Sequence, residues 1–238
     1  MANSINTNAG ALIALQNLNA TNRDLNVAQN RVNTGLKVST AKDNGAIFAI
    51  ATAQRAEMGA LDSVKQSIQR GQSIVDVALA AGETITKALE EQKSLAVAIA
   101  SSTGAAQTAY LADYNALGGE ITKALAGATF DGVNLFSNTT QQSVLTSTSG
   151  ATQNIGTGAA ITVATTATLS APADATAAQA AITAVDTAIS GFTAELGKLG
   201  TQSKSMERQL TFVSKMQDSL EVGTVSYTHL TLPTIYSV

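Results

Sequence analysis

The chain is 238 residues long and contains no cysteine, which excludes disulfides and thiolate metal sites as supports for its fold. Aromatic residues make up only 4% of the sequence and the net charge is −3, so the chain has few large side chains for a compact globular core and no basic surface for a nucleic-acid partner. No segment approaches the roughly twenty apolar residues of a membrane span, and membrane insertion is not expected.

Residues 1–40 are expected to form an N-terminal helical arm. Apolar residues recur in it at seven-residue intervals, as one face of a helix requires, at Leu18, Leu25 and Val32. No Lys or Arg precedes Arg23, and the opening residues contain no uninterrupted apolar core, so a cleaved secretion signal is not predicted.

The arm ends in a polar joint that separates two apolar helical segments. Helix breakers and capping residues crowd into residues 33–45. Gly35 can turn the chain there, and Asp43 or Asn44 can cap the helix that follows.

Residues 41–136 are expected to form the first part of a helical rod domain. A narrow apolar seam repeats every seven residues, which is typical of a coiled coil, at Leu61, Ile68, Val75, Ile85 and Leu89. Gly71, Gly82 and Gln92 interrupt this seam without shifting its phase. A further helical stretch at 105–125 is predicted to fold back on the preceding helix, and the Asp-Gly pair at 131–132 predicts a short hairpin or turn.

Residues 137–175 are expected to be a small exposed insertion. The stretch is rich in Ser and Thr and almost uncharged, so it has no material for a large core. Ile161, Val163 and Thr165 could form one strand.

Residues 176–223 are expected to form the returning helix of the rod domain. The seven-residue register runs without a stutter from Ile182 to Leu220, and its seam contains Ile189, Phe192, Leu196, Leu199, Met206, Leu210, Val213 and Leu220. Three glycines, Gly191, Gly197 and Gly200, lie off this seam, where they either admit another helix or loosen the rod. The predicted fold class is therefore mainly α, with long antiparallel helices in a coiled-coil-like rod and a small β or irregular insertion.

The sequence predicts no enzyme, no metal site and no cofactor. His229 is the single histidine of the chain, and no glycine-rich phosphate loop is present. Glu90 and Glu91 are adjacent and therefore point to different faces of a helix, which makes a poor acid/base pair.

Three stretches resemble one protein family. The sequence NRVNTGLKVSTAKDNGAIFAIA at 30–51 resembles the N-terminal signature of bacterial flagellin. TFDGVNLF at 129–136 and LGTQSKSMERQLTFVSKMQDSL at 199–220 are similar to flagellin as well, in the family's order. The resemblance covers about nine-tenths of the chain and is to alphaproteobacterial members with a short central region.

This resemblance implies a structural subunit that polymerises into the flagellar filament and serves motility. It implies a homopolymer as the main partner, with the type III flagellar export apparatus, an export chaperone and the filament cap as further partners, and an extracellular location after secretion. By position in the family's signature, the candidate subunit-interface residues are Arg31, Asn33, Gly35, Asp43 and Asn44.

Two alternative functions belong to other classes. A hook-filament junction protein shares the terminal helices of flagellin but would cap filaments without forming long ones. A type III secreted coiled-coil effector or adhesin would need an exposed binding domain in the middle of the chain, where this sequence offers only the thin insertion.

Residues 224–238, TVSYTHLTLPTIYSV, depart from the resemblance. They lean towards β structure, contain Pro233 and lack helical spacing. They resemble a translated sequencing adapter, so we expect an artefact that truncates the natural C-terminus. Flagellins continue there as a helix that pairs with the N-terminal arm, and without that partner the chain as written is expected not to polymerise by itself.

Overall fold

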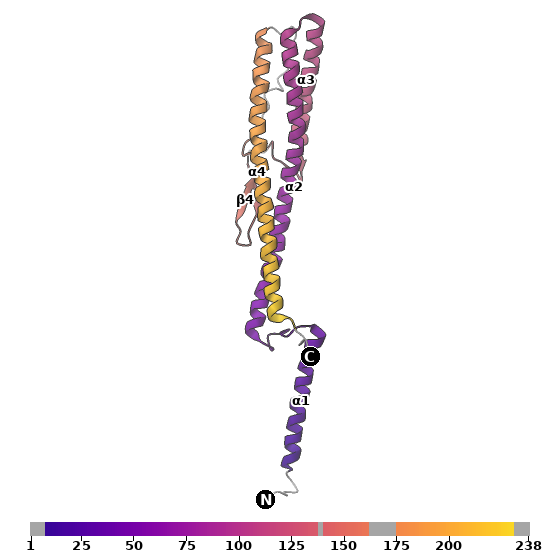
Figure 1. Cartoon of the computed structure of the whole chain (residues 1–238), viewed down its shortest axis with the longest axis vertical. Coiled ribbons are helices and arrows are strands. Elements are labelled where there is room, and N and C mark those ends of the chain that lie inside the picture. Colours follow the sequence, from indigo (N-terminus) through magenta and orange to yellow (C-terminus); the bar gives the residue numbers. More distant parts are fainter. Residues whose placement is uncertain (1–7, 138–139, 162–174, 231–238) are drawn as a thin grey trace, which may run out of the picture. The chain divides into compact units, whose positions relative to one another are not determined.

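The computed structural model describes residues 8–137, 140–161 and 175–230. Four α-helices account for most of this part of the chain: α1 (Ala9–Thr34), α2 (Gly45–Ser101), α3 (Gly104–Gly127) and α4 (Ala175–Thr228), shown in Figure 1. The mainly α prediction is confirmed. The expected strand around Val163 and Thr165 lies outside the described residues, and Ile161 belongs to no strand.

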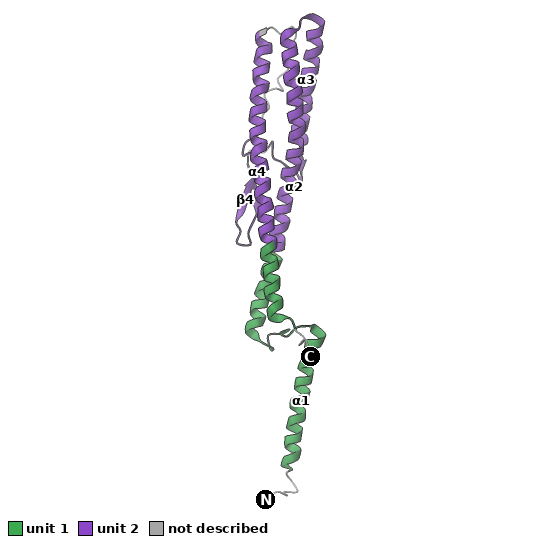
Figure 2. Cartoon of the chain, viewed as in Figure 1, with its two compact units in different colours: residues 1–60, 215–238 green, residues 61–214 purple. Residues whose placement is uncertain are grey.

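The chain forms two compact units. The first contains residues 1–60 and 215–238, and the second contains residues 61–214 (Figure 2). Helices α2 and α4 each contribute residues to both units.

In the second unit, α2 and α4 run antiparallel along one another. Lys93 of α2 is paired with Asp186 near the start of α4, at 2.6 Å between Nζ and Oδ1. Further along, Gly82 lies against Leu196 and Gly71 against Met206, so residue numbers fall on one helix as they rise on the other. Helix α3 folds back beside α2, as predicted, and its Leu111 and Tyr114 share a buried cluster with Ala96 of α2.

The apolar register of α2 lies at the centre of this packing. Leu61, Ile68, Val75, Ile85 and Leu89 are each 0% exposed. On α4 one row of the register is almost equally buried, at Phe192, Leu199, Met206 and Val213, and its next member, Leu220, is half-buried. The other row is only half-buried, at Ile189, Leu196 and Leu210. The second row lies at the margin of the contact, where solvent reaches part of each side chain.

The three interruptions of the α2 register are all buried. A Cβ atom on Gly82 would lie 2.3 Å from Leu196 Cδ2, and one on Gly71 would lie 2.6 Å from a methyl group of Val144. Gln92 is also fully buried, and its side-chain Nε2 donates to the backbone oxygen of Tyr114 at 3.2 Å. Each interruption therefore has a partner: the glycines leave room for apolar side chains, and the glutamine links α2 to α3.

The hairpin predicted at Asp131–Gly132 is confirmed. β1 (Thr129–Phe130) pairs antiparallel with β2 (Val133–Asn134), and the two turn residues have φ angles of 51° and 75°. Such positive φ angles are those of the tight hairpin turns that Asp-Gly pairs favour. Asn134 is buried, and its Nδ2 donates to the backbone oxygen of Leu125 at 2.7 Å, which satisfies a carbonyl group in the last turn of α3.

A second hairpin is formed by part of the insertion. β3 (Gln142–Leu145) pairs antiparallel with β4 (Thr152–Ile155). Val144 and Ile155 are buried, so this part of the insertion is not wholly exposed as expected. Successive side chains of a strand point to opposite faces, and the helices cover the face of the hairpin that carries these two residues.

Polar contacts hold this second hairpin to both long helices. The backbone nitrogen of Leu145 donates to Ser67 Oγ of α2 at 3.0 Å. Gln202 of α4 bonds both backbone groups of Gly156, with its Oε1 accepting from the nitrogen at 2.9 Å and its Nε2 donating to the oxygen at 3.1 Å. The low hydrophobicity of the insertion concealed these contacts in the sequence.

Gly82→Val is expected to lower the free energy of unfolding of the chain by about 1–3 kcal/mol, because the added side chain overlaps Leu196. Gly197→Val is the matched control, since a Cβ there meets no other atom within 4 Å. Thermal unfolding followed by circular dichroism at 222 nm measures both. Equal melting temperatures for the two variants would contradict the assigned contact.

Candidate assembly site

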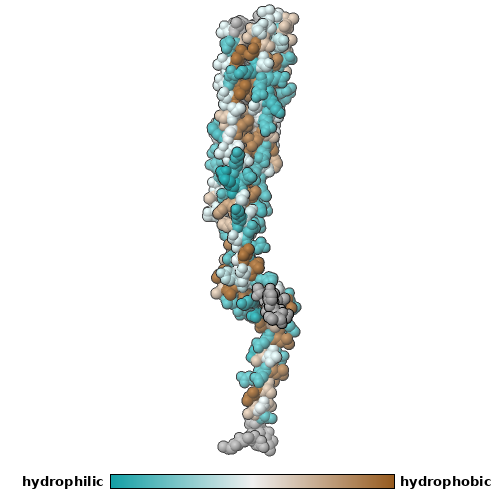
Figure 3. Space-filling model, in the orientation of Figure 1, coloured by the Kyte–Doolittle hydropathy of each residue, from teal (hydrophilic) through white to brown (hydrophobic). Residues whose placement is uncertain are grey.

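Helix α1 exposes its apolar side chains. It begins after Asn8, whose Oδ1 accepts from the backbone nitrogen of Ala11 at 3.1 Å, and none of its residues is buried. Leu12, Leu18 and Leu25 are 52–58% exposed, and Val32 is 71% exposed. Apolar residues accordingly recur along the surface of α1 in Figure 3. A helix of this kind presents an apolar face that is suited to a partner.

Gly35 ends α1 and turns the chain. Its φ angle of 67° lies in the left-handed region, which glycine adopts without the penalty of a side chain. We call residues 35–44, between α1 and α2, the joint. Arg31 lies half-buried in the last turn of α1, where its positive charge is favourable beside the negative end of the helix dipole.

The backbone of the joint pairs with the segment that follows α4. The backbone nitrogen of Lys37 donates to the oxygen of Thr228 at 2.7 Å, and the nitrogen of Leu230 donates to the oxygen of Gly35 at 3.0 Å. Leu36 and His229 thereby form an antiparallel bridge. The joint is thus attached to a segment far from it in sequence.

Asp43 organises the centre of the joint. Its Oδ2 accepts four hydrogen bonds, from the backbone nitrogen and the hydroxyl group of both Ser39 and Thr40, at 2.9–3.2 Å. Hydrogen bonds from the backbone amides lower the pKa of the Asp43 carboxyl below its ordinary value of 3.8. The amide of Thr40 has the largest effect on this pKa and that of Ser39 the next largest. The carboxylate fixes the turn that leads into α2.

Asn44 caps α2. Its Oδ1 accepts from the backbone nitrogen of Ile47 at 3.0 Å, which satisfies one of the free amide groups at the helix start. The structure therefore brings together Gly35, Asp43 and Asn44 as the residues that shape the joint, while Asn33 is exposed in the last turn of α1. Each of the five candidate interface residues lies within or directly before the joint.

The sequence analysis missed the role of residues 224–230. We expected the helical pattern to end before Thr224, and this was wrong, because α4 continues to Thr228. Thr224 and Thr228 are buried, and Thr224 Oγ1 donates to Gln54 Oε1 of α2 at 2.9 Å. A signal was present: Thr224 follows Gln217 by seven residues and so continues the register of α4. Threonine is a weak marker of a buried row, so the continuation was overlooked.

The described residues offer little for catalysis. They contain no group of three or more His, Asp or Glu side chains that could hold a metal ion, and His229 is exposed. A cavity of about 1150 Å³ lies along α4 and is lined mainly by alanine and threonine, with Glu195 as its titratable side chain. Within the described ranges, no helix has a stretch long and apolar enough to cross a bilayer.

Comparison with known sequences decides the family. Residues 5–141 match the bacterial flagellin N-terminal helical region. Flagellin FljM of Caulobacter vibrioides is 47% identical over 231 residues, which cover 93% of this chain and 82% of that protein. This chain belongs to the bacterial flagellin family. A flagellin of Brucella melitensis is 29% identical over 234 residues, covering 92% of this chain and 83% of that one.

A solved flagellin shares the fold. The crystal structure of Bacillus cereus flagellin matches with a TM-score of 0.52 and 25% identity, over 62% of this chain and 88% of that chain. The resemblance to alphaproteobacterial flagellins is confirmed by the Caulobacter and Brucella relatives. The chain is a structural filament subunit, in a family of structural proteins.

Asp43→Ala is expected to expose the amide groups of Ser39 and Thr40 to solvent exchange at pH 6, with little change in helical content. Because the pKa of Asp43 is lowered, the ionised carboxylate supports the joint fully above the ordinary value of 3.8, and this support is lost as the pH falls through the lowered pKa. Amide hydrogen exchange measured by NMR between pH 3 and pH 7 tests both statements.

Asp24→Ala is the control for this experiment, since Asp24 is an exposed aspartate on α1 outside the joint. It should leave the exchange of both amide groups unchanged. Unchanged protection of Ser39 and Thr40 in Asp43→Ala would show that the carboxylate does not hold the turn.

Proposed function

We propose that this flagellin contacts its neighbours in the filament through the apolar face of α1, which the joint presents. The observation that carries the proposal is the exposure of every large apolar side chain of α1. Full burial of an exposed leucine contributes about 1.5–3 kcal/mol, and the leucines of α1 are a little over half exposed, so each can gain about half of that and the row as a whole supplies a substantial driving force. Helices in proteins owe most of their stability to packing, and none of the 26 residues of α1 is buried, which adds a reason for it to find a partner.

The joint supports this contact by its shape. Gly35 and Asp43 are engaged within the chain, so we infer that they act by fixing the path between α1 and α2. Asn33 is exposed and available for a direct contact, and Arg31 lies beside it in the last turn of α1. Asn44 is exposed but already caps α2.

The remaining partners follow from the family. We propose that the subunit leaves the cell through the flagellar type III export apparatus with the help of an export chaperone, and that it is added beneath a filament cap outside the cell. The product is an extracellular homopolymer, and the subunit performs no catalysis. Long helices without disulfides suit a chain that must travel unfolded and refold from packing alone.

The experiment that tests this function is co-polymerisation with a longer relative. Purified Caulobacter vibrioides flagellin FljM is polymerised with a fluorescent form of this chain, and its incorporation is measured by sedimentation and microscopy. We expect incorporation along the whole filament. Label at filament ends alone would favour a hook-filament junction protein, and no incorporation would contradict a filament function and leave an effector or adhesin.

Replacing Leu18 and Leu25 with Ser should reduce incorporation at least tenfold, because two exposed leucines would no longer be buried on assembly. The matched control replaces Asn19 and Asn26 with Ser, which has the same seven-residue spacing one position along α1. Equal incorporation of the two double variants would show that the apolar face of α1 is not the contact.

A further inference from the structure

The second unit carries a row of unpaired carboxylates on α2. Asp76, Glu83 and Glu90 are exposed and repeat every seven residues, so they lie along one side of the helix at intervals of roughly 10 Å. In the described part of the chain none of the three has an ion-pair partner. Lys87 follows Glu83 by four residues and precedes Glu90 by three, so it lies beside the acidic row, but with Glu91 counted this stretch of α2 still has more acids than bases.

A patch of the opposite charge lies on α4. Lys204, Arg208 and Phe212 follow one another at intervals of four residues and therefore share one face of the helix. All three are exposed, and Phe212 is 57% exposed. We call these three residues the basic patch. Among the described residues the two cations have no ion-pair partner. Arginine and aromatic side chains are the types that interfaces favour.

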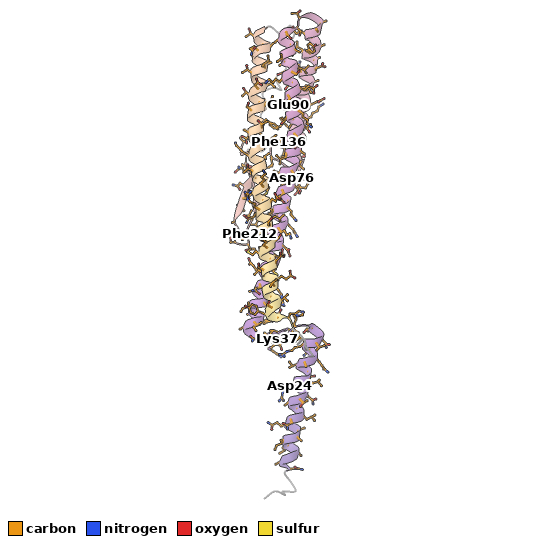
Figure 4. The ribbon with its side chains drawn as sticks, viewed as in Figure 1. Asp24, Lys37, Asp76, Glu90, Phe136 and Phe212 are labelled. Atoms are coloured by element: carbon orange, nitrogen blue, oxygen red, sulfur yellow. The ribbon has the colours of Figure 1, made fainter. Side chains whose placement is uncertain are left out.

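The acidic row and the basic patch are displaced along the unit. Met206, which lies between Lys204 and Arg208 along α4 but faces the interior, is level with Gly71 of α2, whereas the acidic row is centred on Glu83. Twelve residues of helix separate these levels, which is roughly 18 Å at 1.5 Å per residue. Asp76, Glu90 and Phe212 are labelled in Figure 4, on the helices that carry them. Most of the acidic row therefore has no cation of the patch beside it within its own chain.

We propose that the basic patch of one copy docks on the acidic row of a second copy that is displaced along the helix axis. This inference rests on the proposed function, because it specifies how the second units of neighbouring subunits meet. In copies that point the same way, α4 of one copy runs antiparallel to α2 of the next. Arg208 and Lys204 then follow the same direction as Asp76 and Glu83. The two cations are separated along α4 by a rise of roughly 6 Å, and neighbouring acids along α2 by roughly 10 Å. The long side chains of Lys204 and Arg208 can reach across this difference.

The occupant is another copy because both halves of the contact are on this chain. Acids alone on a helix would be an ordinary solvated surface, but here a patch of complementary charge lies on the same unit. Complementary charges of this kind steer association and fix register more than they add affinity, and salt weakens them. Phe212 adds an apolar contact at the end of the patch.

Zero-length cross-linking between copies tests the proposal. Equal amounts of ¹⁴N-labelled and ¹⁵N-labelled chain are mixed at low ionic strength and treated with a carbodiimide, which joins a lysine amine and a carboxylate as an amide with loss of water. Mass spectrometry should find mixed-isotope peptides that join Lys204 to Asp76, Glu83 or Glu90. Their yield should fall at least tenfold at 0.5 M salt, because exposed charges are then screened.

Charge reversal supplies the controls. Arg208→Glu, which keeps the reactive amine of Lys204, should lower the yield of these cross-links. Replacing both Lys204 and Arg208 with Glu removes that amine, and adding Asp76→Lys and Glu83→Lys to the same chain should give mixed-isotope links with the roles exchanged. Glu120→Lys, on the exposed side of α3, should leave the original links intact. Circular dichroism checks that each variant folds.

The proposal is overturned if mixed-isotope links are absent, if Lys204 joins only carboxylates outside the acidic row, or if the fourfold reversal restores nothing. Failure of the filament function itself would be seen separately, as absence of the chain from FljM filaments. A chain that enters filaments but lacks these cross-links would therefore retain its function and refute this contact.

Discussion

The antiparallel packing of α2 against α4 in the second unit is the interaction on which the other elements depend. The buried row of α2 meets the buried row of α4, and Leu196 reaches into the space that Gly82 leaves open. The second hairpin can attach only because these helices are held at a fixed distance, since its bonds to Ser67 and to Gln202 come from different helices. With few aromatic side chains in the sequence, the packing relies on aliphatic side chains that fill the space above Gly71 and Gly82.

Periodicity alone was enough to locate the long helices, because few structures other than packed α-helices give an apolar repeat of seven residues. It could not show what the interruptions do. Gly82 interrupts the repeat in the sequence, yet in three dimensions it receives Leu196 and so strengthens the contact. Gly191, Gly197 and Gly200 of α4 were open to two interpretations. No other element of the described chain packs on them, because a Cβ placed on any of the three meets no atom within 4 Å beyond its own helix backbone and chain neighbours. The approach of a helix from another copy at these positions stays a prediction.

The joint shows where local chemistry suffices and where it does not. Capping by Asn44 and the turn at Gly35 follow from side-chain chemistry and backbone freedom within a few residues, and both could be anticipated. The bridge between Leu36 and His229 joins segments almost two hundred residues apart, and nothing in either segment specifies the other. The insertion was misjudged for a related reason. Its attachment relies on glutamine side chains and two apolar residues, too few to stand out from a Ser/Thr-rich background.

The two units differ in how far they bury their apolar side chains, and this difference is consistent with a subunit that assembles with other copies. The second unit buries the apolar row of α2 and one row of α4 within the chain, so their burial does not depend on a partner. The first unit leaves the apolar face of α1 in solvent, so the free energy of burying that face remains available for contact with another chain. An isolated subunit with this division can fold its second unit before assembly, whereas the apolar side chains of α1 become buried and fixed when it binds. Coupling order to binding in this way lowers the net affinity of each contact, because part of the burial free energy offsets the loss of conformational entropy. A polymer tolerates that cost because each added subunit makes contacts with several neighbours at once.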